Sequence, residues 1–330
     1  MIPNKKSSIL LVLKILEEYT DEDHYLTQQE IIDKISFLYG LDLERKSISS
    51  SIAILRELDY DIEKGPKGGF ALLSRIFDSS EASFLIDAIF SSRGIDGKEA
   101  KRLIEGISKC FSVYQRKDYS YVYKSTELVR TSNKETLYNI SVIHEAIEKN
   151  KRVSFQYISY DKEGKRILRN DGYRYIVSPY YLINNFGRYY LLCNYREKYR
   201  PLQIFRIDMM VNIEIKEDWP IKKMESLMDA PKNFSISKYI NEHIYLFEGQ
   251  VINVKMRLDG EFAISYLKDW FGDNAKITLE DEQIMATVTC DETALYYWVL
   301  QYSNCITILS PSSFIDRVKK GLVEALKKYQ

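Results

Sequence analysis

Three stretches within the first 74 residues carry apolar side chains at helical spacing. The first covers residues 7–19 and forms a broad apolar stripe. The second follows Thr27-Gln-Gln-Glu30, which fits a capping box, and Gly40 suits the end of that helix. In the third, apolar residues recur at i, i+4 and i+7, which predicts a helix that runs to about Leu58.

A hairpin is expected directly after the third helix. The segment YDIEKGPKGGFALL contains two short strand-like runs around a Gly-Pro-Lys-Gly-Gly turn. Three helices followed by a hairpin are the layout of a winged helix-turn-helix. We therefore predict a DNA-binding domain over residues 1–74, followed by a helical linker over residues 75–131.

The later part of the chain shows two different orders of predicted strands and helices. Residues 132–220 give one helix and then five runs dense in Tyr, Phe, Val and Ile, which predict a small five-stranded barrel. Residues 221–248 are interpreted as a connector, and residues 249–330 follow the order βαββαβ of the ferredoxin-like split motif. The expected fold class is therefore a multidomain α+β protein.

The third helix has an unusual outer face, small, polar and basic. Ile48, Ile52 and Leu55 share one side, whereas Lys46, Ser49 and Ser50 fall on the other side. Such a face fits the DNA major groove, where hydroxyls meet phosphates or base edges, although an ordinary solvated surface explains it too. The candidate DNA contacts are Thr27, Gln28, Arg45, Lys46, Ser47, Ser49, Ser50, Lys64 and Lys67.

The distribution of charge along the chain limits the DNA affinity expected of this helix. The chain has 47 basic and 47 acidic residues, so an anionic partner must meet a local patch rather than a global field. Carboxylates outnumber basic side chains within residues 1–74, so a single copy should bind DNA modestly and with strong salt dependence. Because one small winged helix reads few base pairs, we expect a homodimer on paired half-sites.

The composition argues against several other classes of protein. Four scattered cysteines, without a CxxC motif, favour reduced thiols in the cytoplasm and no structural metal. The amino-terminal apolar run is interrupted by Lys14, which favours an amphipathic helix over a signal peptide, and no stretch is apolar enough to span a membrane. No Walker A, GxGxxG or GxSxG motif is found, so neither an enzyme nor a cofactor is expected.

Three segments resemble one family in its usual order. LERKSISSSIAILRELDYDIEKGPKGGFAL resembles the recognition helix and wing of DeoR-like winged helix-turn-helix repressors. The stretch from VSFQYISY through GRYYLLCNY to FRIDMM resembles the WYL domain, and GEFAISYLKDWFG with TILSPSSFIDRVKKGLVEALKKY resembles the extension that accompanies it. The resemblance implies a Sm-like barrel that senses a small anionic or nucleic-acid effector.

The Trp-Tyr-Leu motif of the WYL domain corresponds here to Tyr189-Tyr190-Leu191, in which the first aromatic residue is Tyr. The family often has Arg where this chain has Met209, so one cation of the implied anion site is missing. Basic and aromatic residues alternate across the segment, as in surfaces that bind nucleotides or single strands, although wet barrel faces show the same pattern. The candidate ligand contacts are Tyr157, Arg169, Tyr175, Ser178, Tyr189, Tyr190, Arg206 and Asp208.

Together these observations predict a ligand-responsive transcription regulator that binds double-stranded DNA. The alternative is an accessory protein that binds single-stranded nucleic acid or another protein, with the winged helix as an interaction module. The operator, the effector and the sign of regulation are not encoded in any recognisable motif.

Overall fold

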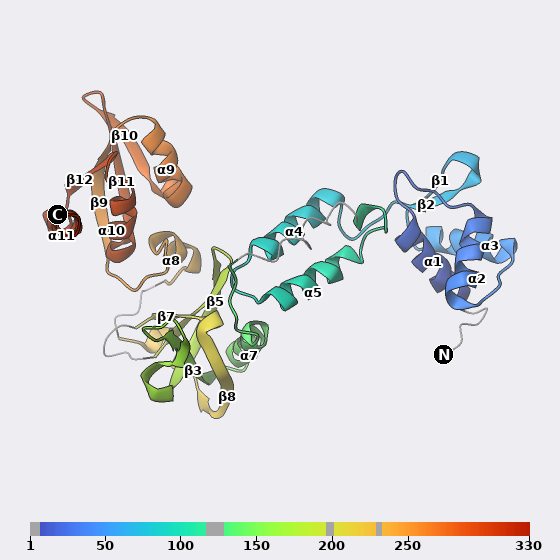
Figure 1. Ribbon diagram of the computed structural model, residues 1–330, viewed down its shortest axis with the longest axis horizontal. Helices are drawn as coiled ribbons and strands as arrows, with labels where there is room; N and C mark the ends of the chain where they lie inside the picture. Colours follow the sequence, from blue (N-terminus) through green and yellow to red (C-terminus); the bar gives the residue numbers. More distant parts are fainter. Residues whose placement is uncertain (1–6, 117–128, 196–200, 229–232) are drawn as a thin grey trace. The chain divides into compact units, whose positions relative to one another are not determined.

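The computed structural model describes residues 7–116, 129–195, 201–228 and 233–330 of a mixed α+β chain (Figure 1). The chain divides into two compact units, residues 1–134 and 135–330, and each is described by itself. No helix in the described ranges combines the length and the apolar character needed to cross a membrane.

The first unit begins with three helices and a hairpin. The helices are α1 (Ser8–Tyr19), α2 (Gln28–Tyr39) and α3 (Arg45–Glu57), and the hairpin consists of β1 (Ile62–Lys64) and β2 (Phe70–Leu72). Their apolar stripes meet in one core, where Ile15, Ile31 and Ile48 are buried. The helical spacing of these residues therefore identified the side of each helix that packs inward.

The ends of α2 follow the local chemistry of its sequence. The Thr27 side chain accepts a hydrogen bond from the Glu30 N–H, and the Glu30 carboxylate accepts one from the Thr27 N–H. Gly40 adopts a left-handed conformation with φ of 64° at the other end, where a residue with a Cβ would be strained. The capping box and the glycine cap are both confirmed.

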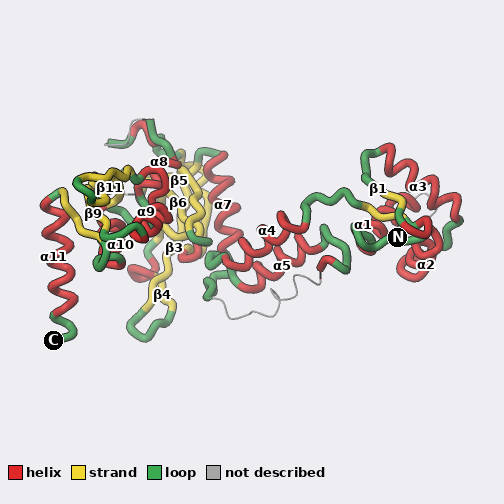
Figure 2. The backbone as a smooth tube through the Cα atoms, turned by 90° about the horizontal axis from the view of Figure 1, so that it is seen from above, coloured by secondary structure: helices red, strands yellow, loops and turns green. Residues whose placement is uncertain are grey.

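The rest of the first unit is a helical hairpin of α4 (Ser79–Ser91) and α5 (Gly97–Ser108), which lie side by side (Figure 2). Ala82, Ile86, Ile104 and Phe111 form a small separate core between them. The predicted linker extends to residue 131, and its residues 117–128 lie outside the described residues.

The second unit starts with α7 (Thr136–Glu148), which packs on a six-stranded sheet. The strand order is β4-β3-β5-β6-β7, and β8 pairs with β3 on the opposite side from β5. The strands are β3 (Lys151–Tyr160), β4 (Arg166–Leu168), β5 (Arg174–Asn185), β6 (Arg188–Asn194), β7 (Gln203–Arg206) and β8 (Met210–Pro220).

The predicted five-stranded barrel is not closed in the described part of the chain. Within the described ranges β7 and β8 form no ladder, because the chain between them turns through the short helix η5 (Ile207–Met209). The free edge of β7 is occupied instead by Glu248, whose carboxylate accepts the Ile204 N–H at 2.9 Å. The short strand β4 was also not predicted, since only the other five runs have strand-like composition.

The open sheet is nevertheless strongly curved. The rings of Phe155 on β3 and Phe205 on β7 have centroids 5.3 Å apart. These strands are three positions apart in the sheet, about 14 Å in a flat arrangement at ~4.8 Å per strand. The sheet must therefore curl for the two rings to touch, and this curvature creates the concave face described below.

The second unit ends with another layer of strands and helices. After the short helix α8 (Ile236–Glu242), the sheet order is β10-β11-β9-β12, with every pairing antiparallel. Along the chain these elements are β9 (Val251–Leu258), α9 (Phe262–Phe271), β10 (Lys276–Glu280), β11 (Gln283–Asp291), α10 (Glu292–Gln301), β12 (Ile306–Ser310) and α11 (Ser312–Leu326). The fully buried Trp298 packs edge-on against Phe271 in their core.

Candidate nucleic-acid and ligand sites

The outer face of α3 is open in the structure. Lys46, Ser49 and Ser50 are exposed, while Ile48 and Ile52 on the opposite face are buried. Arg45 is exposed in the first turn and Ser47 is half-buried. The predicted contacts of this helix therefore lie together on one accessible cationic and hydroxyl-bearing surface.

The start of α2 holds α3 in place. The Gln28 side-chain amide donates to the Ser49 hydroxyl at 2.8 Å, and Arg45 donates to the Gln29 side chain at 3.2 Å. The Thr27 hydroxyl donates to Glu30 at 2.7 Å within the capping box. Thr27 and Gln28, predicted as DNA contacts, are thus engaged in positioning the helices, and Gln29 joins them without having been predicted.

The hairpin after α3 presents both of its predicted lysines to solvent. Lys64 ends β1, and Lys67 lies in the turn with φ of 57°. Gly65 packs directly against the ring of Tyr25, and a Cβ at this position would approach the Tyr25 ring to 2.2 Å. A glycine is therefore needed at position 65 for close packing, which fixes the base of the hairpin relative to the segment before α2.

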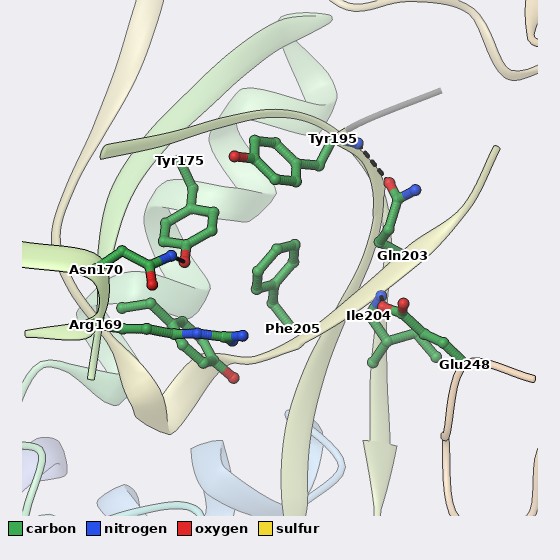
Figure 3. A pocket seen from close by; sticks show the side chains of 9 residues that line it. Arg169, Asn170, Tyr175, Tyr195, Gln203, Ile204, Phe205 and Glu248 are labelled. Atoms are coloured by element: carbon green, nitrogen blue, oxygen red, sulfur yellow. Dashed lines mark hydrogen bonds between the residues drawn. The ribbon is translucent and has the colours of Figure 1, made fainter. Parts of the chain in front are cut away.

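A pocket with a cavity volume of about 290 Å³ opens on the concave face of the curved sheet (Figure 3). Three predicted ligand residues, Tyr157, Arg169 and Tyr175, line it. The residues that line it without having been predicted are Asn170, Tyr195, Gln203, Ile204, Phe205 and Glu248. The pocket therefore combines four aromatic rings with one cation and one carboxylate.

Arg169 reaches the pocket from a tight left-handed turn. Asn170 and Asp171 have φ values of 51° and 53°, and Gly172 follows with φ of 79°. The Asn170 side chain donates to the Tyr175 hydroxyl at 3.1 Å, and Gln156 donates to the Gly172 carbonyl at 2.7 Å. These hydrogen bonds stabilise positive φ angles, which residues other than glycine rarely adopt. The turn places the Arg169 side chain among the rings (Figure 3).

The aromatic wall is built by mutual edge-to-face contacts. Tyr157 lies 5.4 Å from Phe205 and 6.2 Å from Tyr175, measured between ring centroids. The Tyr157 hydroxyl accepts the Arg206 N–H at 3.1 Å. Burial raises the pKa of Tyr157 to about 12, so its phenol remains protonated and neutral near pH 7.

A second cluster surrounds Asp208, whose side chain is 1% exposed. Arg188 donates to one carboxylate oxygen at 2.8 Å, and Arg206 donates to both oxygens at 2.7 and 3.1 Å. The hydrogen bonds to Asp208 raise the pKa of Arg206 above its ordinary value. Burial raises the pKa of the neighbouring Tyr190. Two guanidinium groups are thus oriented by one buried carboxylate.

The structure divides the predicted ligand residues between two faces of the sheet. Phe205 and Arg206 are consecutive in β7, so their side chains point to opposite faces. Tyr157, Arg169 and Tyr175 belong to the pocket, whereas Tyr190 pairs across the strands with Arg206 and lies in the second cluster. In that cluster Arg188 supplies a second cation beside Asp208, although residue 209 is Met.

Ser178 and Tyr189 do not line the pocket. Ser178 is buried, and its hydroxyl accepts the Lys222 N–H at 3.0 Å, so it ties β5 to the segment after β8. Tyr189 packs against the core of the curved sheet. Both residues contribute to the architecture of the domain in this structure.

Some pocket residues that were not predicted have a signal in the local sequence, and others have none. Phe205 and Gln203 alternate with Ile204 and Arg206 along β7, so a strict period-2 analysis could have assigned them to the concave face. Glu248 lies 44 residues further along the chain than its hydrogen-bond partner Ile204. No local pattern predicts a contact of that separation.

The comparison with protein-family models identifies one segment, which includes most of α7 and the curved sheet. Residues 138–215 match the family model described as WYL domain. The match supports assignment of this segment to the WYL family. The comparison with curated proteins finds no match.

Two solved structures are similar to the chain at low identity. One is proteasome accessory factor B/C (PafBC) of Arthrobacter aurescens, with 15% identity, a TM-score of 0.32 and 98% of this chain covered. The other is described as a CRISPR Cas-related protein, with 14% identity, a TM-score of 0.38, and 98% of this chain and 84% of the other covered. The present chain spans 49% of the PafBC chain. Both TM-scores are too low to establish a shared overall fold.

Proposed function

We propose that this protein is a ligand-responsive transcription regulator. Residues 1–74 act as a winged helix-turn-helix that binds duplex DNA, and the WYL segment senses an anionic ligand, a nucleotide or single-stranded nucleic acid. The protein acts by binding and not as an enzyme. The observation that carries this proposal is the exposed face of α3, formed by Lys46, Ser49 and Ser50.

Several features of the first unit support DNA binding. The α3 face is narrow because its outward side chains are small, so the helix can enter the major groove. The exposed Lys64 and Lys67 on the hairpin suit contacts with neighbouring phosphates. The hydrogen bonds from Gln28 and Arg45 between α2 and α3 fix the orientation of the reading helix before DNA arrives.

The pocket of the second unit supports ligand sensing. Its rings offer apolar surface to a base or another flat group, and Arg169 offers a guanidinium to a phosphate. A ligand can change DNA affinity only if it binds one arrangement of the protein better than another. In a homodimer that arrangement is the spacing of two winged helices on paired half-sites.

Selection of bound fragments from genomic DNA, followed by titration of the enriched duplex, tests DNA binding directly. The variant Arg45→Glu with Lys46→Glu should lower duplex affinity by at least about a hundredfold and flatten the salt dependence. Lys14→Glu with Lys109→Glu is the matched control, because it makes the same change in net charge at exposed positions on α1 and after α5. Equal losses in both variants would mean that α3 has no special role.

The same titration distinguishes the alternative function from the proposed regulator. An accessory protein that binds single-stranded nucleic acid or another protein would enrich no duplex sequence. Its single-strand affinity would also be unchanged by the α3 substitutions. Loss of duplex binding in the α3 variant alone therefore favours the regulator.

Titration of the full chain with nucleotides and short oligonucleotides at low salt tests the sensor. Arg169→Ala should weaken binding about tenfold or more, because the pocket loses its cation. Arg166→Ala is the control, since this exposed arginine on β4 lies outside the pocket lining. Absence of binding by every nucleotide and oligonucleotide would remove the sensor from the proposal.

A further inference from the structure

The pocket on the curved sheet holds a carboxylate as well as a cation, and we infer that Glu248 makes this pocket selective for guanine nucleotides. The inference rests on the proposed function, in which the pocket binds an anionic nucleotide. It adds the identity of the base and the residue that reads it.

Glu248 is held in place at the edge of the sheet. It lies between α8 and β9, and its carboxylate accepts the Ile204 N–H of the edge strand β7 at 2.9 Å. Among the described residues this is its one hydrogen bond, and a carboxylate has about four acceptor directions. The group therefore has acceptor capacity left for a ligand while its position is already fixed.

The two charged groups enter the pocket from different elements. Figure 3 shows Arg169 extending from its turn on one side, while Glu248 lies with Ile204 on the other, and the rings of Tyr175, Tyr195 and Phe205 stand around the space. A ligand that fills the cavity must satisfy a cation at one end and an acceptor at the other. A nucleotide offers a phosphate for the first and a base edge for the second.

The chemistry of the base edges then discriminates among nucleotides. Guanine presents two adjacent donors, N1–H and the 2-amino group, which match a carboxylate. Adenine and cytosine place an acceptor nitrogen beside their amino donor, and uracil has one N–H between two carbonyl oxygens. A carboxylate has no donor for those acceptors and repels them, so it disfavours all three bases.

The cavity and its electrostatics fit this assignment. A volume of about 290 Å³ is at the small end for ligand pockets, which suits one nucleotide better than a larger effector. Burial and the charge of Glu248 raise the pKa of the Cys193 thiol. The exposed Glu248 is thus close enough to the core of the curved sheet to act on a buried group.

Binding of GMP, AMP, CMP and UMP to the full chain, measured by isothermal titration calorimetry at low salt, tests the inference. GMP should bind at least about tenfold more tightly than the other three, since two-point pairing at a base edge discriminates strongly against bases that lack the matching donors. Inosine monophosphate keeps N1–H but lacks the 2-amino group, so its affinity should fall between those of GMP and AMP.

Glu248→Gln is the decisive variant. It keeps a side-chain oxygen to accept the Ile204 N–H but removes the charge and one acceptor, so the preference for GMP should fall to within about threefold. Glu282→Gln, in the exposed turn between β10 and β11, is the matched control and should keep the preference.

The two possible failures are distinguishable. Equal affinity of the wild-type protein for all four nucleotides, or a preference for GMP that survives Glu248→Gln, would overturn the inference and leave the sensing pocket in place. Absence of binding by any nucleotide would overturn the nucleotide sensor itself, and the inference with it.

Discussion

The Ser112 hydroxyl donates a hydrogen bond of 2.5 Å to the Asp21 carboxylate across 91 positions of sequence. Asp21 is 5% exposed, and its second oxygen lies 2.6 Å from Nδ1 of His24, whose ring stacks on Tyr114 with centroids 3.7 Å apart. Within the first unit this network joins the segment after α1 to the segment after α5. It is therefore expected to hold α1, α2 and α3 on the helical hairpin of α4 and α5.

Asp21→Asn should loosen this junction in a pH-dependent way. Burial alone would raise the pKa of Asp21, but hydrogen bonds from Ser112, His24 and the Asp23 N–H outweigh it, so the pKa lies below its ordinary value of 3.8. A carboxyl group with a lowered pKa stabilises the fold above its unfolded pKa and loses this effect as the pH falls through the folded pKa. The variant should lose about 1–3 kcal/mol near pH 7.

Hydrogen exchange of amides in residues 8–24 at pH 7, 5 and 3 checks this prediction, because it reports the stability of one region in a chain of several domains. The difference between wild type and variant should shrink below about pH 4. Asp23→Asn changes an exposed neighbour and should have little effect. A difference that persists unchanged at pH 3 would contradict the assigned role of the ionised carboxylate.

Asp208→Asn should destabilise the WYL segment by about 3–5 kcal/mol, because it leaves Arg188 and Arg206 without their buried countercharge. Urea unfolding measures the loss, and Asp218→Asn on the exposed part of β8 is the control. Sulfate should restore more stability to Asp208→Asn than to the control by binding the released guanidinium groups. Equal responses to sulfate would mean that the two arginines do not form an anion site.

Gly65→Ala should displace the hairpin of the first unit. The new Cβ would approach Cδ1 of Tyr25 to 2.2 Å, a contact that the ring cannot relieve without moving. We expect duplex affinity to fall about tenfold, ~1.4 kcal/mol, with helical content preserved by circular dichroism. Gly106→Ala, which has open space in α5, should bind DNA normally, and Gly65→Ala with Tyr25→Ala should regain affinity. Normal binding by Gly65→Ala alone would show that hairpin placement is unimportant.

The cysteines should differ in reactivity. Burial raises the pKa of Cys290 to about 12, and it raises the pKa values of Cys193 and Cys305 as well. Because the thiolate is the reactive form, alkylation of the native protein at pH 8 should modify the half-buried Cys110 first. Peptide mass spectrometry measures the order of labelling. Modification of Cys193 at the rate of Cys110 would contradict the burial of the Cys193 thiol in the core of the curved sheet.

Local sequence patterns predicted a large share of the elements for identifiable reasons. The capping box at Thr27 and the glycine cap at Gly40 depend on residues within a few positions of each other. The buried faces of the helices follow from a 3.6-residue period, as Ile48 and Ile52 illustrate. The strand-like composition of five runs located β3, β5, β6, β7 and β8, but the short exposed β4 carries no such signal.

Closure of the sheet and assembly of the pocket required the tertiary structure. Whether β7 pairs with β8 depends on the turn at Ile207–Met209 and on the contact of Glu248 with the edge of β7. Amino-acid composition predicts neither feature. The sequence grouped Tyr190 and Arg206 with Tyr157 and Arg169 in one predicted ligand site. In the structure the side chains of β7 alternate between two faces, so Arg206 lies on the face opposite Phe205. The curvature of the sheet then determines which rings meet.

The sequence by itself determined where helices and most strands form and which face of α3 is polar, because these properties arise from neighbours within one or two turns of chain. Only the tertiary structure decided that the sheet stays open, that Arg169 and Glu248 line one pocket, and that Asp208 is shared by Arg188 and Arg206. These contacts join residues that are tens of positions apart or lie on different strands, and no local periodicity encodes such pairings.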